Sequence, residues 1–307
     1  MKYEIILNPI AGKGYAPKHI PVINKFLEEN NCDYEIHVTH HPGHAISLAR
    51  DFARNKNAVV IAAGGDGTCN EVINGLMQAK NEIEHIPLLG VLPIGRGNDF
   101  AFGAHIPAQL ETSLVILISG HSQPMDVGIV YGGDYPEGRY FGNGIGVGFD
   151  TLVGLEAAKM KHIHGAAGYA IGALKTLIKY PPAPELELKF DDTKLHATPA
   201  LVSSMNGNRM GGTFFMSPEA NNNDGILNLC MTKQGKRLEL LKAMLHYTKG
   251  TQQSLDNTTT LQSPFFSLEA KSGHLAVHAD GETICEAGHK IEVKCLSSAI
   301  NIICKKL

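Results

Sequence analysis

The first part of the chain alternates between two hydrophobic periodicities. Apolar runs at residues 3–7, 58–63 and 88–92 are typical of strands buried on both faces of a parallel sheet. Apolar residues recur at helical spacing over the stretches that separate or follow these runs, namely residues 20–29, 44–54, 70–77 and 108–119. Residues 34–39 alternate as a further strand. This succession of strand and helix predicts a parallel α/β domain.

The second half of the chain is dominated by strand patterns. Residues 127–149 are glycine-rich strand with a hairpin at residues 132–136, and further strands follow from Glu185 onward. Residues 237–247 form one predicted helix in this region. Another apolar helix is predicted at residues 165–179, where core packing is the expected role and a lipid-facing wall the alternative. The pattern predicts a β-rich second domain.

Composition narrows the classes of function. The 307 residues carry a net charge of −3, and 19% charged with 43% hydrophobic residues is typical of a folded globular protein. Because there is no basic footprint, we expect no nucleic-acid partner. No stretch reaches the ~18 uncharged apolar residues of a spanning helix. The six cysteines include no C-x-x-C pair, so we expect reduced thiols and a cytoplasmic location.

The run Gly64-Gly65-Asp66-Gly67-Thr68 joins a buried strand to a helix. Its glycines would allow positive φ angles and the close approach of another group to the backbone. Amides at the start of a helix suit a phosphate, and an Asp beside that phosphate fits if a divalent cation lies between them. The alternative is a tight turn with a solvated Asp.

Two further glycine-bearing loops follow predicted strands. Gly12 and Lys13 lack the P-loop spacing, so they are either phosphate contacts or a plain surface loop. In the other loop, Arg96 can pair with phosphate oxygens, and Asn98 and Asp99 can bind ligand hydroxyls or a metal. Alternatively, Asp99 caps a helix. Because loops at the ends of adjacent parallel strands share one edge, they are expected to converge on one crevice.

Carboxylates also occur at three later positions. Asp126, taken alone, is a turn residue at the opening of a strand. Residues 221–225 could hold a cation through Asp224 and carbonyl oxygens, or form a turn stabilised by Asn and Asp side chains. Asp280 and Glu282 flank one glycine, which predicts a hairpin or a general base beside a metal.

Taken together and in this order, four motifs resemble those of the diacylglycerol kinase catalytic-domain family, which includes soluble bacterial lipid kinases and the sphingosine and ceramide kinases. The motifs are Asn-Pro-x-x-Gly-Lys from Asn8, Gly-Gly-Asp-Gly-Thr-x-Asn-Glu from Gly64, Pro-x-Gly-x-Gly-Asn-Asp-Phe from Pro93, and Asp-Gly-Glu from Asp280. NAD kinases and phosphofructokinases share the central motif more loosely.

The resemblance implies a phosphofructokinase- or NAD-kinase-like α/β domain that binds ATP, residues 1–126 plus 289–307, and a C-terminal β-sandwich that takes the lipid, residues 127–288. ATP would bind to Asn8, Pro9, Gly12, Lys13, Thr39, Gly64, Gly65, Asp66, Gly67, Thr68, Asn70, Glu71, Gly95, Arg96, Asn98 and Asp99. Asp66, Asp99 and Asp126 would organise Mg²⁺ and the phosphates. Glu282, beside Asp280, would take the proton from the lipid hydroxyl. Asn221 and Ile226, through their carbonyls, and Asp224 match the family's structural metal turn.

The implied activity is ATP- and Mg²⁺-dependent phosphorylation of diacylglycerol, or of a related lipid, to phosphatidic acid. A kinase of a soluble acceptor and a non-catalytic lipid or nucleotide sensor are the alternatives. Arg96 stands where the family usually has Thr. A membrane lipid substrate implies peripheral, reversible membrane contact. A lysine patch at Lys159, Lys161, Lys175 and Lys179 could assist that contact, and homodimerisation is left open.

Overall fold

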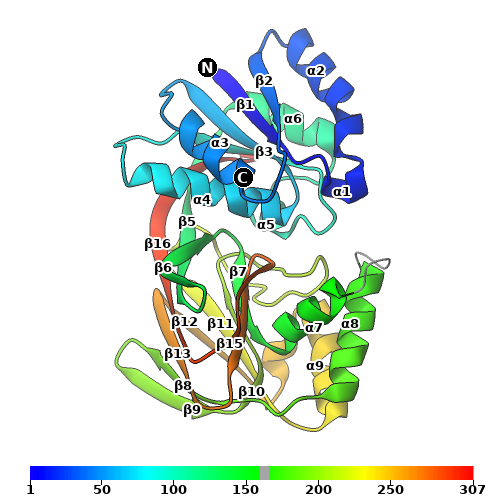
Figure 1. Cartoon of the computed structure of the whole chain (residues 1–307), viewed down its shortest axis with the longest axis vertical. Helices are drawn as coiled ribbons and strands as arrows, with labels where there is room; N and C mark the ends of the chain where they lie inside the picture. The colour runs from blue at the N-terminus through cyan, green and yellow to red at the C-terminus, as the bar shows by residue number, and fades with distance from the viewer. Residues whose placement is uncertain (160–165, 307) are drawn as a thin grey trace. The chain divides into compact units, whose positions relative to one another are not determined.

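The computed structural model describes residues 1–159 and 166–306 (Figure 1). The chain divides into two compact units. Unit 1 comprises residues 1–127 and the segment from Ser297 to the C-terminus, and unit 2 comprises Gly128–Leu296. Residues 289–296, which the sequence assigned to the first domain, therefore belong to unit 2.

Unit 1 is built on a parallel sheet in the order β2-β1-β3-β4, continued by the C-terminal part of β16. The strands are β1 (Lys2–Leu7), β2 (Asp33–Val38), β3 (Ala58–Gly64), β4 (Leu88–Pro93) and β16 (Lys290–Ile303). Every residue of β3 is buried, as its unbroken apolar run predicted. Ile302 of β16 lies opposite Leu89 of β4, so the last strand of the chain completes the first domain.

Helices cover both faces of this sheet. They are α1 (Ala11–Gly14), η1 (Ala16–His19), α2 (Ile20–Glu29), α3 (His44–Phe52), α4 (Asp66–Lys80), α5 (Asp99–Gly103) and α6 (Leu110–Ser119). α2 and α6 pack on the face that bears Ile5 and Ile61, and α3 and α4 cover the other face (Figure 1). Gly75 of α4 lies against the carbonyl of Ile46 in α3, where a Cβ atom would collide. This glycine therefore lets the two helices pack closely.

Unit 2 contains two layers of antiparallel strands. One is a six-stranded sheet in the order β12-β11-β10-β7-β14-β15; the other contains β13, β8 and β9 beside the N-terminal part of β16, with β5 and β6. The strands are β5 (Ser122–Gly132), β6 (Tyr135–Phe141), β7 (Gly144–Gly148), β8 (Glu185–Phe190), β9 (Thr193–Ala197), β10 (Pro199–Met205), β11 (Leu227–Lys233), β12 (Thr258–Ser263), β13 (Phe265–Ser272), β14 (Leu275–Ala279) and β15 (Glu282–Gly288). Their inner faces form one core, which includes Phe141, Val147, Leu188, Val277 and Val293.

The outer face of the six-stranded sheet is covered by helices. These are α7 (Phe149–Ala158), α8 (Ala166–Lys179) and α9 (Arg237–Lys249), followed by the short η2 (Gln252–Ser254). All seven residues of β10 are buried, because Val202 faces the sandwich core while Leu201 and Met205 face the helices. Within the described ranges, no helix has the length and apolar character needed to cross a membrane.

Several local expectations are corrected. The helix expected from residue 70 begins at Asp66, so the Asp-Gly-Thr run forms its first turn. Asn98, in a left-handed conformation, precedes α5 as the N-cap, and Asp99 is the first helical residue. Asp126 does not open a strand; it lies inside β5 and is fully buried. The stripe of α8 was expected to pack in a core, but Leu174 and Ile178 are exposed.

Candidate active site

Three loops meet at the carboxyl ends of β1, β3 and β4. A Cβ atom on Gly95 would collide with the Cα of Gly65, and one on Gly12 would lie 2.8 Å from the carbonyl oxygen of Ile94. Gly64 likewise has no room for a side chain beside Thr68. The glycines of the central motif were expected to allow positive φ, but none of Gly64, Gly65 and Gly67 has one. Gly65 instead permits the close approach of the loop that bears Gly95, and Gly64 permits tight packing against Thr68.

Asparagine side chains fasten these loops. Asn8 donates from Nδ2 to Thr68 Oγ1 at 3.2 Å and accepts a bond from the amide of Ile10 at 3.1 Å. Asn98 donates from Nδ2 to the carbonyl oxygens of Pro93 and Gly95, each at 3.3 Å. Its Oδ1 is buried and has no hydrogen-bond partner among the residues described. That oxygen is available to a ligand or a water.

Two carboxylates converge between the second and third loops. Asp66 Oδ1 accepts a hydrogen bond from the amide of Phe100 at 2.9 Å, which ties the start of α4 to α5. A Cβ atom on Gly97 would lie 3.0 Å from Asp66 Oδ2 and 3.3 Å from Asp99 Oδ2, so both oxygens border the same point. Paired carboxylate oxygens are the donors that Mg²⁺ prefers, so these residues fit that ion.

Three other residues expected to bind the nucleotide make contacts within unit 1, and their binding of the nucleotide stays a prediction. Glu71 accepts hydrogen bonds from the amides of Gly43 at 2.8 Å and Ala45 at 3.1 Å, and it thereby caps α3. Asn70 has no exposed surface and accepts bonds from Asn74. The amide of Thr39, a residue that is itself buried, donates to Leu7 at 2.9 Å.

The remaining expected nucleotide residues and Asp126 differ in exposure. Lys13 and Arg96 are exposed cations, and Pro9 lies in the first loop. Asp126 is buried, and its Oδ1 accepts a bond from the amide of Ser298 at 2.7 Å. Ligation of a metal by Asp126 stays a prediction.

A different acidic cluster lies on the strands. Glu4, Glu35 and His37 bring their ligand atoms within 4.8 Å of one another. Lys2 Nζ already lies 3.0 Å from Glu4 and 2.7 Å from Glu35, and hydrogen bonds to Glu35 and Glu4 raise the pKa of that lysine. Because a lysine supplies the positive charge here, the cluster is explained without a metal.

In unit 2, Asp280 anchors the turn between β14 and β15. Its carboxylate accepts hydrogen bonds from the amides of Gly142 at 2.8 Å, Asn143 at 3.0 Å and Gly144 at 2.9 Å. Three backbone amides hold this carboxylate in place, so Asp280 is a structural anchor of the turn, and a catalytic role for it stays a prediction. Glu282 begins β15 and is exposed. The two expected catalytic carboxylates therefore differ in environment.

An Asp–His pair that the sequence interpretation missed lies beside this turn. Asp150, at the start of α7, places Oδ2 3.2 Å from Nε2 of His278 in β14, and its Oδ1 accepts a bond from the amide of Thr151 at 2.7 Å. A carboxylate placed directly after the glycine-rich strand β7 and before an apolar helix was the signal that could have drawn attention to it.

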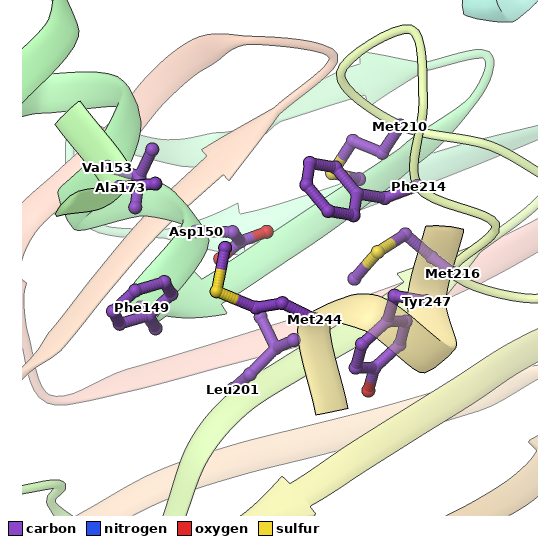
Figure 2. Close-up of a pocket in the computed structure, with 10 residues that line it drawn as sticks. All are labelled: Phe149, Asp150, Val153, Ala173, Leu201, Met210, Phe214, Met216, Met244 and Tyr247. Atoms are coloured by element: carbon purple, nitrogen blue, oxygen red, sulfur yellow. The ribbon is translucent and has the colours of Figure 1, made fainter. Parts of the chain in front are cut away.

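Asp150 also lies at an apolar pocket between the six-stranded sheet and its helices (Figure 2). The pocket has a volume of about 40 Å³ and is lined by Phe149, Asp150, Val153, Ala173, Leu201, Met210, Phe214, Met216, Met244 and Tyr247. The Tyr247 hydroxyl is bonded to Thr232 Oγ1 at 2.8 Å, and burial raises its pKa well above the ordinary value. Tyr247 is therefore neutral, and Asp150 is the acidic residue among the ten lining residues described.

Two further expectations concern unit 2. Asp224 Oδ1 accepts a bond from the amide of Ile226 at 3.0 Å, which favours a turn stabilised by its own side chain. Metal binding there by Asn221, Asp224 and Ile226 stays a prediction. Of the expected lysine patch, Lys159 and Lys179 both pair with Glu156, at 3.2 and 2.7 Å. Lys161 lies outside the described residues. The six cysteines are free thiols.

Comparison with known proteins agrees with this arrangement. The model of the diacylglycerol kinase catalytic domain matches residues 2–130, and that of the YegS C-terminal NAD kinase beta sandwich-like domain matches residues 143–304. A diacylglycerol kinase of Bacillus subtilis is 30% identical over 249 residues, 80% of this chain and 78% of that protein. A probable lipid kinase YegS-like protein of Chromohalobacter salexigens is 31% identical over 248 residues, 80% of this chain and 76% of that protein.

Solved structures show the same fold. A crystal structure of a diacylglycerol kinase from Bacillus anthracis gives a TM-score of 0.73 at 20% identity, covering 99% of this chain and 97% of that one. Yeast NADH kinase in complex with NADH gives 0.51 at 11% identity, covering 100% and 84%. The predicted α/β domain with a C-terminal β-sandwich is therefore confirmed. From its two domain matches and its relatives at 30% identity or more, the chain belongs to the diacylglycerol kinase catalytic-domain family, a family of kinases.

Proposed function

We propose that this protein is a lipid kinase that transfers the γ-phosphoryl group of ATP, with Mg²⁺, to the hydroxyl of diacylglycerol or a closely related lipid. The observation that carries the proposal is the apolar pocket of unit 2. Asp150, the acidic residue of its lining, contacts His278, and His278 lies in β14, the strand that leads to Asp280. An acceptor with an aliphatic body and a polar head matches that lining.

The loops of unit 1 supply the nucleotide side of the reaction. Exposed Lys13 and Arg96 neutralise phosphate oxygens, and the amides at the start of α4 donate to them. Asp66 and Asp99 would hold Mg²⁺, which when bound neutralises charge on the phosphates. The loops are held against one another by packed glycines, so these groups are positioned before the nucleotide arrives.

Unit 2 binds the lipid that accepts the phosphoryl group, and it supplies the carboxylate that accepts the proton of the lipid hydroxyl. The lipid hydroxyl oxygen forms a bond to the γ-phosphorus, the bond from that phosphorus to the β–γ bridging oxygen breaks, and ADP leaves. Glu282, exposed and one glycine away from the anchored Asp280, takes the hydroxyl proton. Asp280 keeps the turn in place, and Asp150 holds His278 in the strand that leads to that turn.

The pocket speaks against a soluble acceptor. A nucleotide or sugar would leave its hydroxyls and charges against Phe149, Val153 and Phe214 without partners, which is costly. The pocket is narrow for an acyl chain, but Met210, Met216 and Met244 line it, and methionine side chains adapt readily to the shape of a ligand. A sensor without turnover does not account for an exposed Glu282 beside the anchored turn.

The test is an acceptor panel with labelled ATP and Mg²⁺. Diacylglycerol, monoacylglycerol, sphingosine and ceramide are presented in detergent micelles, and NAD and glycerol in buffer. Labelled phosphatidic acid from diacylglycerol is the expected product. Transfer to NAD alone would establish a soluble acceptor, and tight ATP binding without transfer to any acceptor would establish a sensor.

A lipid substrate places the protein at a membrane surface. We expect it in the cytoplasm with reversible, peripheral attachment. Glu156 pairs with Lys159 and Lys179 and so offsets part of the positive charge of the expected lysine patch.

A further inference from the structure

We propose that the outward face of α9, continued by α8, is a docking surface that inserts leucines into an anionic bilayer. The proposal rests on the proposed lipid kinase function. It adds the surface by which the protein binds the membrane that contains its substrate. It commits to a lipid surface rather than to a protein partner.

Leucines occupy the side of α9 that is farthest from the core. Leu240, Ala243 and Tyr247 are buried and face the sheet. At about 100° per residue, Leu238, Leu241 and Leu245 lie on the opposite side of the helix. They are 78%, 43% and 59% exposed. A helix of a soluble protein normally carries polar side chains on the side that faces away from the core. These leucines lie outside the core and form an exposed apolar patch, which marks an interaction surface.

Cations lie among these leucines. Lys242 and Lys249 fall on the same outward side of α9, and exposed Arg237 begins the helix. Glu239 is the acidic residue of α9. A helix that combines leucines with lysines on its exposed side is suited to a membrane interface, where leucines enter the acyl region and cations meet lipid phosphates. A second copy of the chain fits less well, because self-docking would bring like charges together.

The neighbouring helix α8 also carries exposed apolar side chains. Leu174 and Ile178 are 58% and 62% exposed, and exposed Lys175 lies beside them. The end of α8 is tied to the segment before α9, because Tyr180 Oη donates to the carbonyl of Gly235 at 2.8 Å. Figure 1 shows the two helices side by side on the same flank of unit 2.

The same two helices line the apolar pocket on their inner sides. Ala173 of α8 and Met244 and Tyr247 of α9 border it (Figure 2). A bilayer seated on the outer leucines would therefore lie one helix thickness from the pocket. With this arrangement the lipid has a short path from the bilayer to the pocket, and it does not pass through water on the way.

The experiment measures co-sedimentation with vesicles of phosphatidylglycerol and phosphatidylcholine, and with phosphatidylcholine alone. The variants are L238Q/L241Q/L245Q and K242E/K249E, and the matched control is V22Q/V115Q, which replaces exposed valines of unit 1. We expect both α9 variants to lose at least about tenfold in binding to anionic vesicles, and the control to bind like the wild type. Unfolding midpoints check folding, and the single variant L238Q replaces the triple variant if the latter does not fold.

Activity separates this proposal from the proposed function. Turnover of a short-chain diacylglycerol in detergent should be unchanged in the α9 variants. If the wild type phosphorylates no lipid but binds vesicles through these leucines, the kinase proposal fails and the docking surface stands. If the α9 variants bind vesicles like the wild type, the docking surface is overturned. Conversion of a dimer to a monomer by the leucine variant, with vesicle binding intact, would assign the face to a second copy.

Discussion

Asp280 and Gly144 hold each other through two hydrogen bonds. The amide of Gly144 donates to Asp280 Oδ1 at 2.9 Å, and the amide of Asp280 donates to the carbonyl of Gly144 at 2.9 Å. This reciprocal pair, with the bonds from Gly142 and Asn143, fixes the turn that precedes Glu282. Asp280 therefore has a structural task in the Asp-Gly-Glu motif, while Glu282 is the residue proposed for the chemistry.

Substitution of the two carboxylates separates those tasks. Asp280→Asn replaces an acceptor with a donor that faces backbone amides, and we expect it to cost about 1–3 kcal/mol of stability. Glu282→Gln changes an exposed residue, so its unfolding midpoint should match the wild type while phosphoryl transfer falls about 100-fold or more. Thermal unfolding and initial rates check both, and an active Glu282→Gln enzyme would remove Glu282 from the chemistry.

The close approach of Gly65 and Gly95 makes a packing prediction. In Gly95→Ala the methyl group meets Gly65 Cα and Asn98 Oδ1, so the two loops must separate. We expect weaker ATP binding by titration calorimetry and a loss of about 1–3 kcal/mol in stability. Gly154→Ala is the matched control, because its methyl group meets no atom within 4 Å. Equal ATP affinity in both variants would contradict the packing of these loops.

The proposed contact between Arg96 and the phosphates of the nucleotide can be tested by substitution. It is exposed on the third loop, and we expect it to bind phosphate oxygens of the nucleotide. Arg96→Ala should raise the KM for ATP about tenfold and make it less sensitive to salt. Lys56→Ala, another exposed cation of unit 1, should change neither. A lower KM in Arg96→Ala would mean that the arginine obstructs the nucleotide.

Asp150 is predicted to support lipid turnover by holding His278 in the strand that leads to the Asp280 turn. Asp150→Asn keeps the shape of the pocket lining but removes the charge that faces His278. We expect the kcat/KM for diacylglycerol to fall about tenfold or more while ATP affinity is unchanged. Asp192→Asn, an exposed change in the same unit, provides the control. A selective loss of ATP affinity would instead place Asp150 on the nucleotide side.

Hydrophobic periodicity predicted the strands and helices that depend mainly on residues close together in the sequence. The apolar run at residues 58–63 became β3, and the stripe at residues 20–29 became α2 with those bounds. Of the two uses expected for the glycines of the central motif, Gly64 and Gly65 show the close approach and not the positive φ, and sequence spacing does not reveal which neighbouring loop comes close. Buried Asp126 was likewise taken for a turn residue, since its partner Ser298 is far away in sequence.

The pocket could not be predicted from the sequence either, because it too depends on contacts between segments that are distant in sequence. Asp150 and His278 are brought together by the pairing of β7 with β14, a contact between distant segments. The outward leucines of α9 illustrate a second limit, because periodicity alone cannot tell which stripe of a helix faces the core. Both features required the positions of the sheets to be known.

The most direct measurement of the central claim is transfer of labelled phosphate from Mg²⁺-ATP to diacylglycerol in mixed micelles, by the wild type and by Glu282→Gln side by side. The account predicts labelled phosphatidic acid with the wild type and almost none with a normally folded Glu282→Gln protein. No lipid product from the wild type, or equal product from the two proteins, would contradict it.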